Sequence, residues 1–399
     1  MGSEPVPFSK RSFLILPFSI LAFTLSLLVW FRAPTYFFWL VAVVVSEFSW
    51  IPLLLDLFLL ALALETGKEL ALIFCLVSCL FFLRPYLVAL VRGRAIRKGL
   101  KRAFPWVEQR GMLRRPFSLL KLCTGVAGSR VPVTPMDYSQ TADGPLLLDF
   151  YRAQADGPRP LVVVVHGGSW MTGDRGQLPE LNHYLARAGY HVAAIDYRLA
   201  PAFQYPVPVS DTHLAIAFLK GKAEHLQIDQ EKIVLLGRSA GGQIALMAAY
   251  GRKPIAGVRG VISFYAPADM VWGAVSRSNK WVLDTASIFL NYLGAAWRDA
   301  PERYQEASPC AQVHPGCPST LILHGRIDSL VSWRHSVRLA EKLKAQKVPY
   351  YFLSLPCTTH GFDYSLRGPS GQAALFVLER FLQSVTEERN GPCSHQERP

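Results

Sequence analysis

The sequence predicts an α/β fold, with a mostly parallel central sheet flanked by helices and a helical cap insertion, preceded by an all-α transmembrane segment. Three observations lead to this prediction. The chain has 399 residues, 51% hydrophobic and 18% charged, which excludes intrinsic disorder and leaves room for a large domain and an additional part. From about residue 131, short apolar runs alternate with helical patterns. Before residue 92, three long apolar runs follow one another.

The positive charge is concentrated in one short segment. The net charge of +13 comes from 42 Lys and Arg against 29 Asp and Glu. Residues 92–130 hold eleven basic and one acidic side chain, whereas residues 1–91 hold five of each and residues 131–399 hold 26 and 23. A nucleic-acid enzyme would spread its basic residues over the folded domain, so we expect no nucleic-acid partner.

The first and third apolar runs have the length of membrane spans. Ser12 to Phe31 is uncharged over 20 residues, which covers about 30 Å as a helix and suffices to cross a bilayer core. A secretory signal is the competing interpretation, but the run is longer than a usual signal core and no small-residue cleavage site follows it. Leu70 to Val91 forms the third run.

The second run, Tyr36 to Leu64, is interrupted by Glu47, Pro52 and Asp56. With 29 residues it is long for one upright helix, so tilt, a kink at Pro52 and a short hairpin all remain open. The two acids are either functional groups inside the membrane or, more commonly, groups that lie near an interface or pair within a helix bundle. We expect about three spans in total.

The basic segment orients the chain. Cytoplasmic loops carry an excess of Lys and Arg, so the segment predicts an integral membrane protein with its large C-terminal domain on the cytoplasmic side. The segment is either an interfacial helix on anionic headgroups or a solvated linker. The expected organisation is a transmembrane region at residues 1–91, a basic juxtamembrane linker at 92–130, a large α/β domain at 131–387 and a polar tail at 388–399.

The domain after residue 131 is expected to be doubly wound. Strands such as Leu161 to Val165 are apolar at every position, as in a parallel sheet covered by helices on both faces. The expected strands are residues 146–151, 161–165, 191–196, 233–236, 258–264, 320–323 and 350–355. The expected helices are residues 178–187, 211–226, 239–250, 333–345 and 370–383.

Ala268 to Ala300 breaks this rhythm. The interval is rich in aromatic residues, namely Trp272, Trp281, Phe289 and Trp297, and lies between two expected strands. We interpret it as a cap lining an acyl pocket, with an ordinary core helix and a long loop as the alternative.

The sharpest chemical motif is Gly237-Arg238-Ser239-Ala240-Gly241. It follows an expected strand and opens an expected helix, which is the context of a nucleophile elbow. The glycines fit this turn because the serine backbone is strained and has close neighbours. Ser239 is therefore the candidate nucleophile.

A serine hydroxyl needs a base and an acid to become nucleophilic. His360 follows the expected strand 350–355 and precedes Gly361-Phe362, which makes it the best of the five histidines after Ser239. Asp328 follows the expected strand 320–323 and would orient the imidazole, with Asp269 as the alternative acid. The order Ser239, Asp328, His360 is that of α/β-hydrolases.

The oxyanion of the reaction needs preorganised donors. His166-Gly167-Gly168-Ser169-Trp170 follows the expected strand 161–165, and its adjacent glycines let backbone amides approach a tetrahedral oxygen. Together with the Ala240 amide they would form the oxyanion hole.

Five motifs carry a family resemblance: HGGSWMTGD, DYRLAP, GRSAGG, HGRIDSLV and HGF. From about residue 131 to 387 the chain resembles the hormone-sensitive-lipase-like and acetyl or feruloyl esterase branch of the α/β-hydrolase superfamily. The resemblance implies an α/β-hydrolase fold and a serine esterase activity. By position it implies Ser239 as nucleophile, Asp328 and His360 as its partners, the amides of Gly168, Ser169 and Ala240 as oxyanion hole, and Asp174 and Asp211 as loop and helix-cap supports.

The chain departs from this family at three positions. Ser169 replaces a third glycine, a feature similar to other esterases and to kynurenine formamidases, so ester and amide substrates both stay open. Arg238 stands where an acidic or small residue is common, and Ala202 replaces the usual acid after DYRLAP. The apolar N-terminal part lies outside the core family, although prenylcysteine methylesterases similarly join such a hydrolase to membrane spans.

The expected function is a membrane-anchored serine carboxylesterase that acts on a small-molecule or lipid ester beside the lipid bilayer. Amide or formamide hydrolysis, acyl transfer, a catalytically silent binding protein and a transporter with a soluble domain are the alternatives. No organic cofactor is required, and because zinc-like pair spacing and an HExxH motif are absent from the sequence, no metal is expected. The seven cysteines are expected to be reduced, with a Cys310–Cys317 disulfide as the alternative.

Overall fold

A computed structural model describes residues 9–105, 111–126, 128–251 and 254–387 of the chain. The expected polar tail at residues 388–399 lies outside this part.

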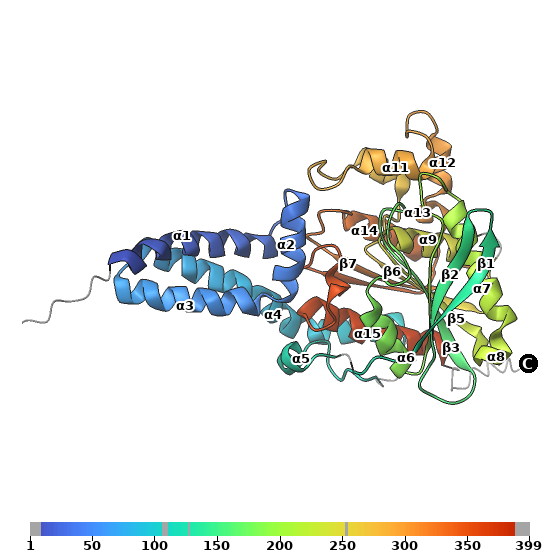
Figure 1. The fold of residues 1–399 in the computed structure, drawn as a ribbon, viewed down its shortest axis with the longest axis horizontal. Coiled ribbons are helices and arrows are strands. Elements are labelled where there is room, and N and C mark those ends of the chain that lie inside the picture. The colour runs from blue at the N-terminus through green and yellow to red at the C-terminus, as the bar shows by residue number, and fades with distance from the viewer. Residues whose placement is uncertain (1–8, 106–110, 127, 252–253, 388–399) are drawn as a thin grey trace, which may run out of the picture.

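The centre of the molecule is one eight-stranded sheet in the order β1-β2-β4-β3-β5-β6-β7-β8 (Figure 1). Strands β1 and β2 pair antiparallel, as do β2 and β4, while all pairs from β4 to β8 are parallel. The strands are β1 (Val133–Thr141), β2 (Gly144–Tyr151), β3 (Arg159–Val165), β4 (His191–Ile195), β5 (Ile228–Arg238), β6 (Val258–Phe264), β7 (Ser319–Gly325) and β8 (Tyr350–Leu355).

Helices cover both faces of the sheet. In β3, Val163 and Val165 face one core while Val162 and Val164 face the other, as the period of two requires. The first core is covered by α7 (Val207–Gly221), α9 (Ala240–Tyr250) and α14 (Arg334–Ala345), with the short α8 (Ala223–Leu226) at its edge. The second is covered by α6 (Pro179–Arg187) and α15 (Pro369–Thr386), beside the short α5 (Leu119–Thr124). The predicted doubly wound fold is confirmed.

The interval expected to be a cap, Ala268 to Ala300, contains two short helices over the first core, α10 (Met270–Val275) and α11 (Thr285–Leu293). Two more short helices follow it before β7, namely α12 (Pro301–Glu306) and α13 (Pro309–Gln312). The ring of Tyr292 in α11 stacks on Trp170, with centroids 4.2 Å apart. Trp170 belongs to the loop after β3, so α11 is held beside the carboxyl ends of the parallel strands.

The N-terminal part projects from this domain as a bundle (Figure 1). It consists of α1 (Ser9–Ser26), the 3-10 turn η1 (Leu27–Val29), α3 (Trp50–Thr66) and the first half of α4 (Glu69–Ala103), whereas α2 (Tyr36–Glu47) lies across its end against the domain. By length and composition, α4 is the one described helix able to cross a membrane, and α2 with α3 makes a second only if the bent pair counts as one span. The apolar stretch Phe13–Val29 is shorter, so this count falls below the three spans expected.

The second apolar run is broken between α2 and α3, whose axes differ by 85°. The break precedes Pro52, which lies in the first turn of α3, where proline is tolerated. Glu47, at the end of α2, accepts hydrogen bonds from the backbone amides of Ser370 and Gly371, at 3.2 and 3.3 Å. Glu47 thus ties α2 to the start of α15.

The other acid of that run, Asp56, stays inside the bundle. Its carboxylate accepts hydrogen bonds from Ser78 and Cys79 of α4. Asp56 therefore pairs within the bundle, as the more common of the two interpretations expects, whereas Glu47 pairs with backbone amides of α15.

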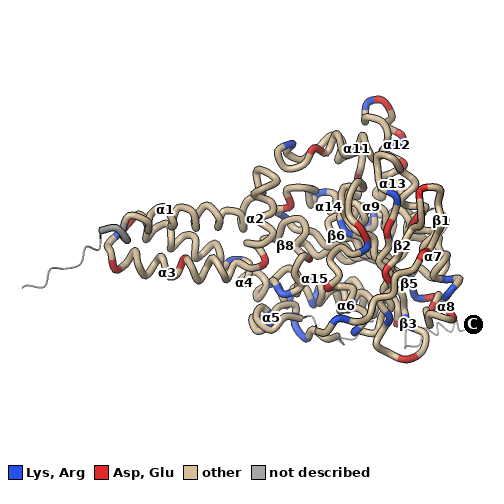
Figure 2. Tube along the Cα trace, viewed as in Figure 1, with Lys and Arg blue, Asp and Glu red and all other residues tan. Residues whose placement is uncertain are grey.

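Helix α4 crosses the expected boundary at residue 91 without a break. Its second half carries basic residues on one side and buries Ile96 and Leu100 in the same core as α15 on the other. Arg92 donates to the carbonyl oxygen of Ser354 at 3.0 Å. Residues 92–103 are thus part of a helix packed on the domain, neither a solvated linker nor a free interfacial helix. Figure 2 shows these basic residues at the domain end of the bundle.

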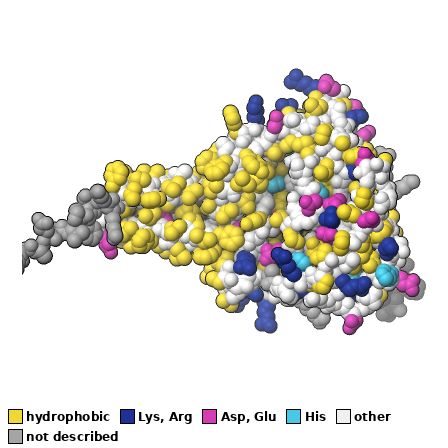
Figure 3. Space-filling view, in the orientation of Figure 1, with side chains coloured by type: hydrophobic (Ala, Val, Ile, Leu, Met, Phe, Trp, Pro, Cys, Tyr) yellow, Lys and Arg dark blue, Asp and Glu magenta, His cyan; other side chains and the backbone are white. Residues whose placement is uncertain are grey.

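The bundle presents apolar side chains outward. Of the 34 large hydrophobic side chains that are exposed in the described residues, 25 precede residue 92. In Figure 3, hydrophobic side chains cover most of the face of the bundle that is in view. Soluble monomers rarely expose a patch of this extent, so this surface is of the kind that is covered by lipid or protein.

Candidate active site

Ser239 lies in the sharp turn between β5 and α9. Its φ of 52° falls in the left-handed region, which is uncommon for a residue with a side chain. A Cβ on Gly241 would collide with the backbone carbonyls of Val165 and His166, so the close approach of α9 to β3 requires glycine there. This turn holds the hydroxyl at the carboxyl end of the sheet.

The structure brings Ser239, His360 and Asp328 together. The Nε2 atom of His360 lies 3.0 Å from Ser239 Oγ, and its Nδ1 lies 2.7 Å from Asp328 Oδ2. The three residues come from loops after β5, β8 and β7, which the parallel strand order places at one edge of the sheet. Each distance is within hydrogen-bond range, so one proton can pass from the hydroxyl to the imidazole.

Asp328 is held as an anion. Its Oδ1 accepts the amides of Leu330 and Val331 at 2.9 and 2.8 Å. Burial by itself raises the pKa of this carboxyl, but attraction to His360 and hydrogen bonds from His324 and His360 outweigh burial and bring the pKa below its usual value. An ionised Asp328 can orient the imidazole and stabilise its protonated form.

A second histidine contacts the same carboxylate, and the sequence analysis missed its role. His324 Nε2 lies 3.1 Å from Asp328 Oδ2 and 2.9 Å from the carbonyl oxygen of Val331, and its Nδ1 lies 2.7 Å from Ser336 Oγ. The available signal was the position of His324 at the end of β7, four residues before Asp328.

The alternative acid, Asp269, is occupied elsewhere. It caps α10 by accepting the amide of Trp272 at 2.9 Å and pairs with Arg338 at 2.6 Å. The structure does not bring it to His360.

The loop after β3 aims backbone amides at the space above Ser239. Gly168, Ser169 and Trp170 have φ values of 125°, 54° and 62°, and the Gly167 amide is fixed by Gln177 Oε1 at 2.8 Å. Within the described residues, the amides of Gly168 and Ser169 donate to no protein acceptor. The Ala240 amide, at the first turn of α9, has no intrahelical partner. These three amides are the ones that the sequence analysis predicts as donors to an oxyanion.

The two expected supporting acids hold neighbouring loops. Asp174 Oδ1 accepts the amide of Gly176 at 2.7 Å. Asp211 pairs with Arg198 at 2.6 Å and accepts its backbone amide at 2.9 Å, although it lies within α7 rather than at its cap.

Arg238, one of the departures from the family pattern, lies wholly buried beneath Ser239. Its Nε donates to Asp363 Oδ2 at 2.5 Å, and the hydroxyl of Tyr265 donates to the other oxygen of Asp363. Asp363 follows His360 by three residues, so this ion pair joins the serine turn to the histidine loop. Nothing in the sequence paired these two residues.

Two cavities meet at Ser239. One, of about 50 Å³, lies under α11 and is lined by Trp170, Ile288 and Phe289. The other, of about 600 Å³, is more open and contains His360 and Tyr265. Ser239 and Ser169 line both, so the reacting carbonyl would sit where the two cavities join.

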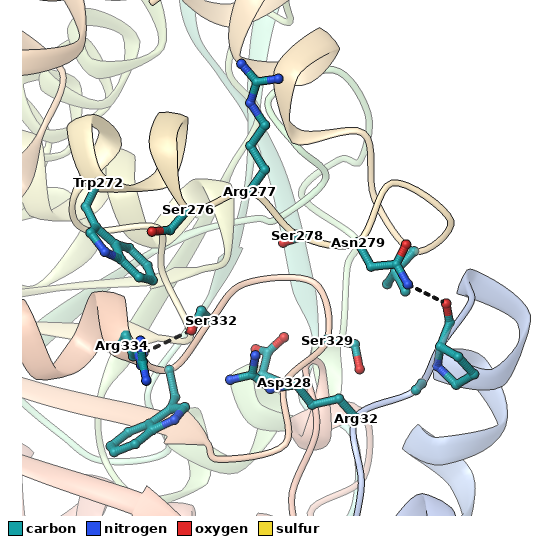
Figure 4. Close-up of a pocket in the computed structure, with 14 residues that line it drawn as sticks. Arg32, Trp272, Ser276, Arg277, Ser278, Asn279, Asp328, Ser329, Ser332 and Arg334 are labelled. Atoms are coloured by element: carbon teal, nitrogen blue, oxygen red, sulfur yellow. Dashed lines mark hydrogen bonds between the residues drawn. The ribbon is translucent and has the colours of Figure 1, made fainter.

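A third hollow, of about 650 Å³, lies on the far side of Asp328. Arg32, Arg277 and Arg334 line it together with several serines, but neither Ser239 nor His360 does. Figure 4 shows Arg277 directed away from Asp328. This hollow adjoins the acid of the site and does not hold the reacting atoms.

The described cysteines, namely Cys75, Cys79, Cys123, Cys310, Cys317 and Cys357, are free thiols. The alternative Cys310–Cys317 disulfide is therefore absent. In the part of the chain that the structure describes, no group of three or more His, Cys, Asp or Glu is arranged to hold a metal ion.

Known proteins resemble this chain over the same region. The family model BD-FAE matches residues 148–343. The probable carboxylic ester hydrolase LipM of Mycobacterium tuberculosis is 28% identical over 251 residues, which cover 57% of this chain and 55% of LipM. Esterase LipC of the same organism is 28% identical over 60% of this chain and 63% of its own length. The chain thus spans less than two thirds of the length of these relatives.

Solved structures show the same fold. A hyperthermophilic esterase from Pyrobaculum calidifontis superposes with a TM-score of 0.57 at 22% identity, covering 73% of this chain and 92% of that chain. A bacterial heroin esterase gives a TM-score of 0.56 at 22% identity, covering 67% and 88%. The domain built around the eight-stranded sheet therefore has the α/β-hydrolase fold that the sequence predicts.

Proposed function

We propose that this protein is a carboxylic ester hydrolase, a serine esterase that works through an acyl-enzyme. The observation that carries the proposal is the hydrogen-bonded line from Ser239 Oγ through His360 to Asp328, beside unpaired amides of the loop after β3. The esterase names of the relatives and of the similar structures support the same reaction class.

The proposed mechanism follows from these positions. His360 Nε2 takes the proton of Ser239 as the hydroxyl oxygen attacks the ester carbonyl. The amides of Gly168, Ser169 and Ala240 stabilise the oxyanion. The protonated His360, stabilised by Asp328, then gives its proton to the leaving alcohol. A water then attacks the acyl carbon of the acyl-enzyme while His360 Nε2 takes its proton. The bond from the acyl carbon to Ser239 Oγ breaks, His360 returns the proton to Ser239 Oγ, and the carboxylic acid leaves.

Membrane anchoring is a further part of the proposal. The apolar surface of the bundle supports it, because such a surface is stable only when it is covered. The basic residues of α4 at the domain end support an orientation with the catalytic domain on the cytoplasmic side. In this proposal α1, α3 and the first half of α4 enter the bilayer, and α2 lies on the catalytic domain outside it.

The test is hydrolysis of p-nitrophenyl acetate, butyrate and palmitate by the full chain in detergent, compared with Ser239→Ala. We expect the variant to lose several orders of magnitude in kcat while its thermal unfolding is unchanged. Ser210→Ala, on an exposed position of α7, is the matched control and should retain full activity. Near-normal turnover by Ser239→Ala would overturn the proposed nucleophile.

A matched pair of substrates distinguishes ester hydrolysis from amide hydrolysis by the same residues. We expect p-nitrophenyl acetate to be cleaved with a far higher kcat/KM than p-nitroacetanilide. A preference for the anilide would replace the esterase proposal by an amidase.

A further inference from the structure

Helix α2 forms one wall of the larger cavity at Ser239. The α2 residues that line this cavity are Tyr36, Trp39, Leu40, Val43 and Val44. Their spacing of three and four residues places them on one face of the helix. Tyr36, Leu40 and Val44 are about half exposed, at 50, 46 and 48%. An N-terminal helix thus offers an apolar surface to the active site.

Contacts at both ends fix α2 to the domain. The Tyr36 amide donates to the carbonyl oxygen of Trp281 at 3.0 Å, and Asn279 Nδ2 donates to the Pro34 carbonyl at 3.0 Å, a contact drawn in Figure 4. At the other end, Glu47 binds the amides at the start of α15. The helix is held against the site from both ends.

The middle of α2 reaches the catalytic histidine loop. The indole Nε1 of Trp39 donates to the carbonyl oxygen of His360 at 3.2 Å. The position of α2 is therefore coupled to that of His360.

The position of His360 determines which cavity takes the leaving group. When a serine esterase cleaves an ester, the histidine gives its proton to the oxygen of the leaving alcohol. The alcohol part of the substrate must therefore lie next to His360. His360 lines the large cavity beside α2 and does not line the small one. The alcohol therefore belongs with α2, and the acyl group belongs under α11.

The two cavities differ strongly in size. A single water molecule occupies on the order of 10–15 Å³ of cavity volume. The cavity under α11, with about 50 Å³, therefore accepts an acyl group of only a few heavy atoms. The cavity of about 600 Å³ beside α2 accepts a much larger group, and its α2 wall is apolar.

We propose that α2 is the wall of the leaving-group site, and that the substrate is a short-chain acyl ester of a large apolar alcohol held in the bilayer. This inference rests on the proposed esterase function and on the anchoring of the bundle. In the reaction, the acyl carbon forms a bond to Ser239 Oγ and its bond to the alcohol oxygen breaks. The proton of Ser239 passes through His360 to that oxygen, and water then releases the short carboxylic acid.

The experiment varies the two sides of the ester separately. The full chain in mixed micelles is given acetates of 1-butanol, 1-octanol and 1-dodecanol, and ethyl esters of butanoic, octanoic and dodecanoic acid. Unbranched primary alcohols have similar leaving-group acidity, so differences report binding. We expect kcat/KM to rise at least about tenfold from butyl to dodecyl acetate, because each added CH₂ group is buried against the apolar α2 wall. It should fall at least about tenfold from ethyl butanoate to ethyl dodecanoate, because the cavity under α11 has no room for a long acyl chain.

Variants of α2 test the wall itself. The double variant Leu40→Gln with Val44→Gln should lower kcat/KM for dodecyl acetate about tenfold. Its kcat/KM for butyl acetate should stay within about twofold of the value for the parent protein. Phe37→Gln is the matched control, because Phe37 is exposed on the same helix but does not line the cavity. Phe37→Gln should leave kcat/KM for both substrates unchanged.

The outcomes separate the two proposals. Higher kcat/KM for long acyl chains would overturn the assignment of α2 to the leaving group. Equal kcat/KM of the double variant and Phe37→Gln for dodecyl acetate would overturn it as well. In both cases, hydrolysis of p-nitrophenyl acetate would still support the esterase. Absence of Ser239-dependent hydrolysis of p-nitrophenyl acetate overturns the esterase itself.

Discussion

Trp39 of α2 donates a hydrogen bond to the backbone carbonyl of His360, in the loop after β8, although the two residues lie 321 positions apart in the chain. Their rings also meet edge to face, with centroids 6.5 Å apart. The N-terminal helices are therefore connected directly to the group that we propose moves the proton.

Trp39→Phe keeps an aromatic ring and removes the donor to the His360 carbonyl. A hydrogen bond of this kind contributes about 0.5–1.5 kcal/mol, so we expect kcat for p-nitrophenyl acetate to fall roughly two- to tenfold with little change in KM. Steady-state kinetics measure both. Trp281→Phe, whose side chain is exposed, is the control. An unchanged kcat in Trp39→Phe would show that this bond does not position His360.

His324 and His360 share the Asp328 carboxylate, and we expect their contributions to differ. Asp328→Asn cannot stabilise the protonated imidazole, so kcat should fall by roughly 10⁴-fold, as in other serine triads. His324→Gln keeps a donor near Asp328 Oδ2 and should cost much less. Comparison of kcat for the two variants decides this point, and an equal loss in both would give His324 a larger role than support of the acid.

The ion pair of Arg238 with Asp363 is wholly buried, with both side chains 1% exposed. Arg238→Met leaves a buried carboxylate without its cation, so we expect the free energy of unfolding to fall by about 3–5 kcal/mol. Arg238→Met combined with Asp363→Asn removes both charges and should recover most of that loss. Chemical denaturation of the parent protein and of both variants measures the loss, and a double variant no more stable than the single one would contradict the argument.

His335 is buried behind the cap and accepts the amide of Asp269 through Nδ1 at 3.2 Å. Burial lowers the pKa of His335 to about 3. Because the unfolded chain binds this proton near pH 6.5, its contribution to stability is complete above that pH and is lost as the pH falls towards 3.

The variant His335→Gln isolates this titration. It keeps an acceptor for the Asp269 amide but does not titrate, so its melting temperature should fall less between pH 7 and pH 4 than that of the parent protein. Differential scanning calorimetry at matched ionic strength provides the comparison. Parallel curves for the two proteins would mean that His335 does not remain neutral in the fold.

Much of the fold could be read from hydrophobic patterning. The strands at residues 258–264 and 350–355 have the bounds that the sequence predicted. Strand β1 was missed because its residues, VTPMDYSQT, are mostly polar, as fits a strand at the edge of the sheet with one exposed face. The end of the apolar run predicts a boundary at residue 91, but α4 continues to Ala103 because Ile96 and Leu100 pack on the domain.

The order of the candidate site residues along the chain follows from the sequence alone: a glycine pair after one strand, then a serine in a glycine-flanked turn, and then an acid and a histidine after later strands. These features are local, because each follows from the residues next to it and from the strand before it. The surroundings of these residues become visible only in three dimensions. The contact of α2 with His360, the second histidine on Asp328 and the pairing of Arg238 with Asp363 join elements that are distant in sequence or lie on different loops. Such contacts depend on how helices and loops pack in three dimensions, which a local pattern does not encode.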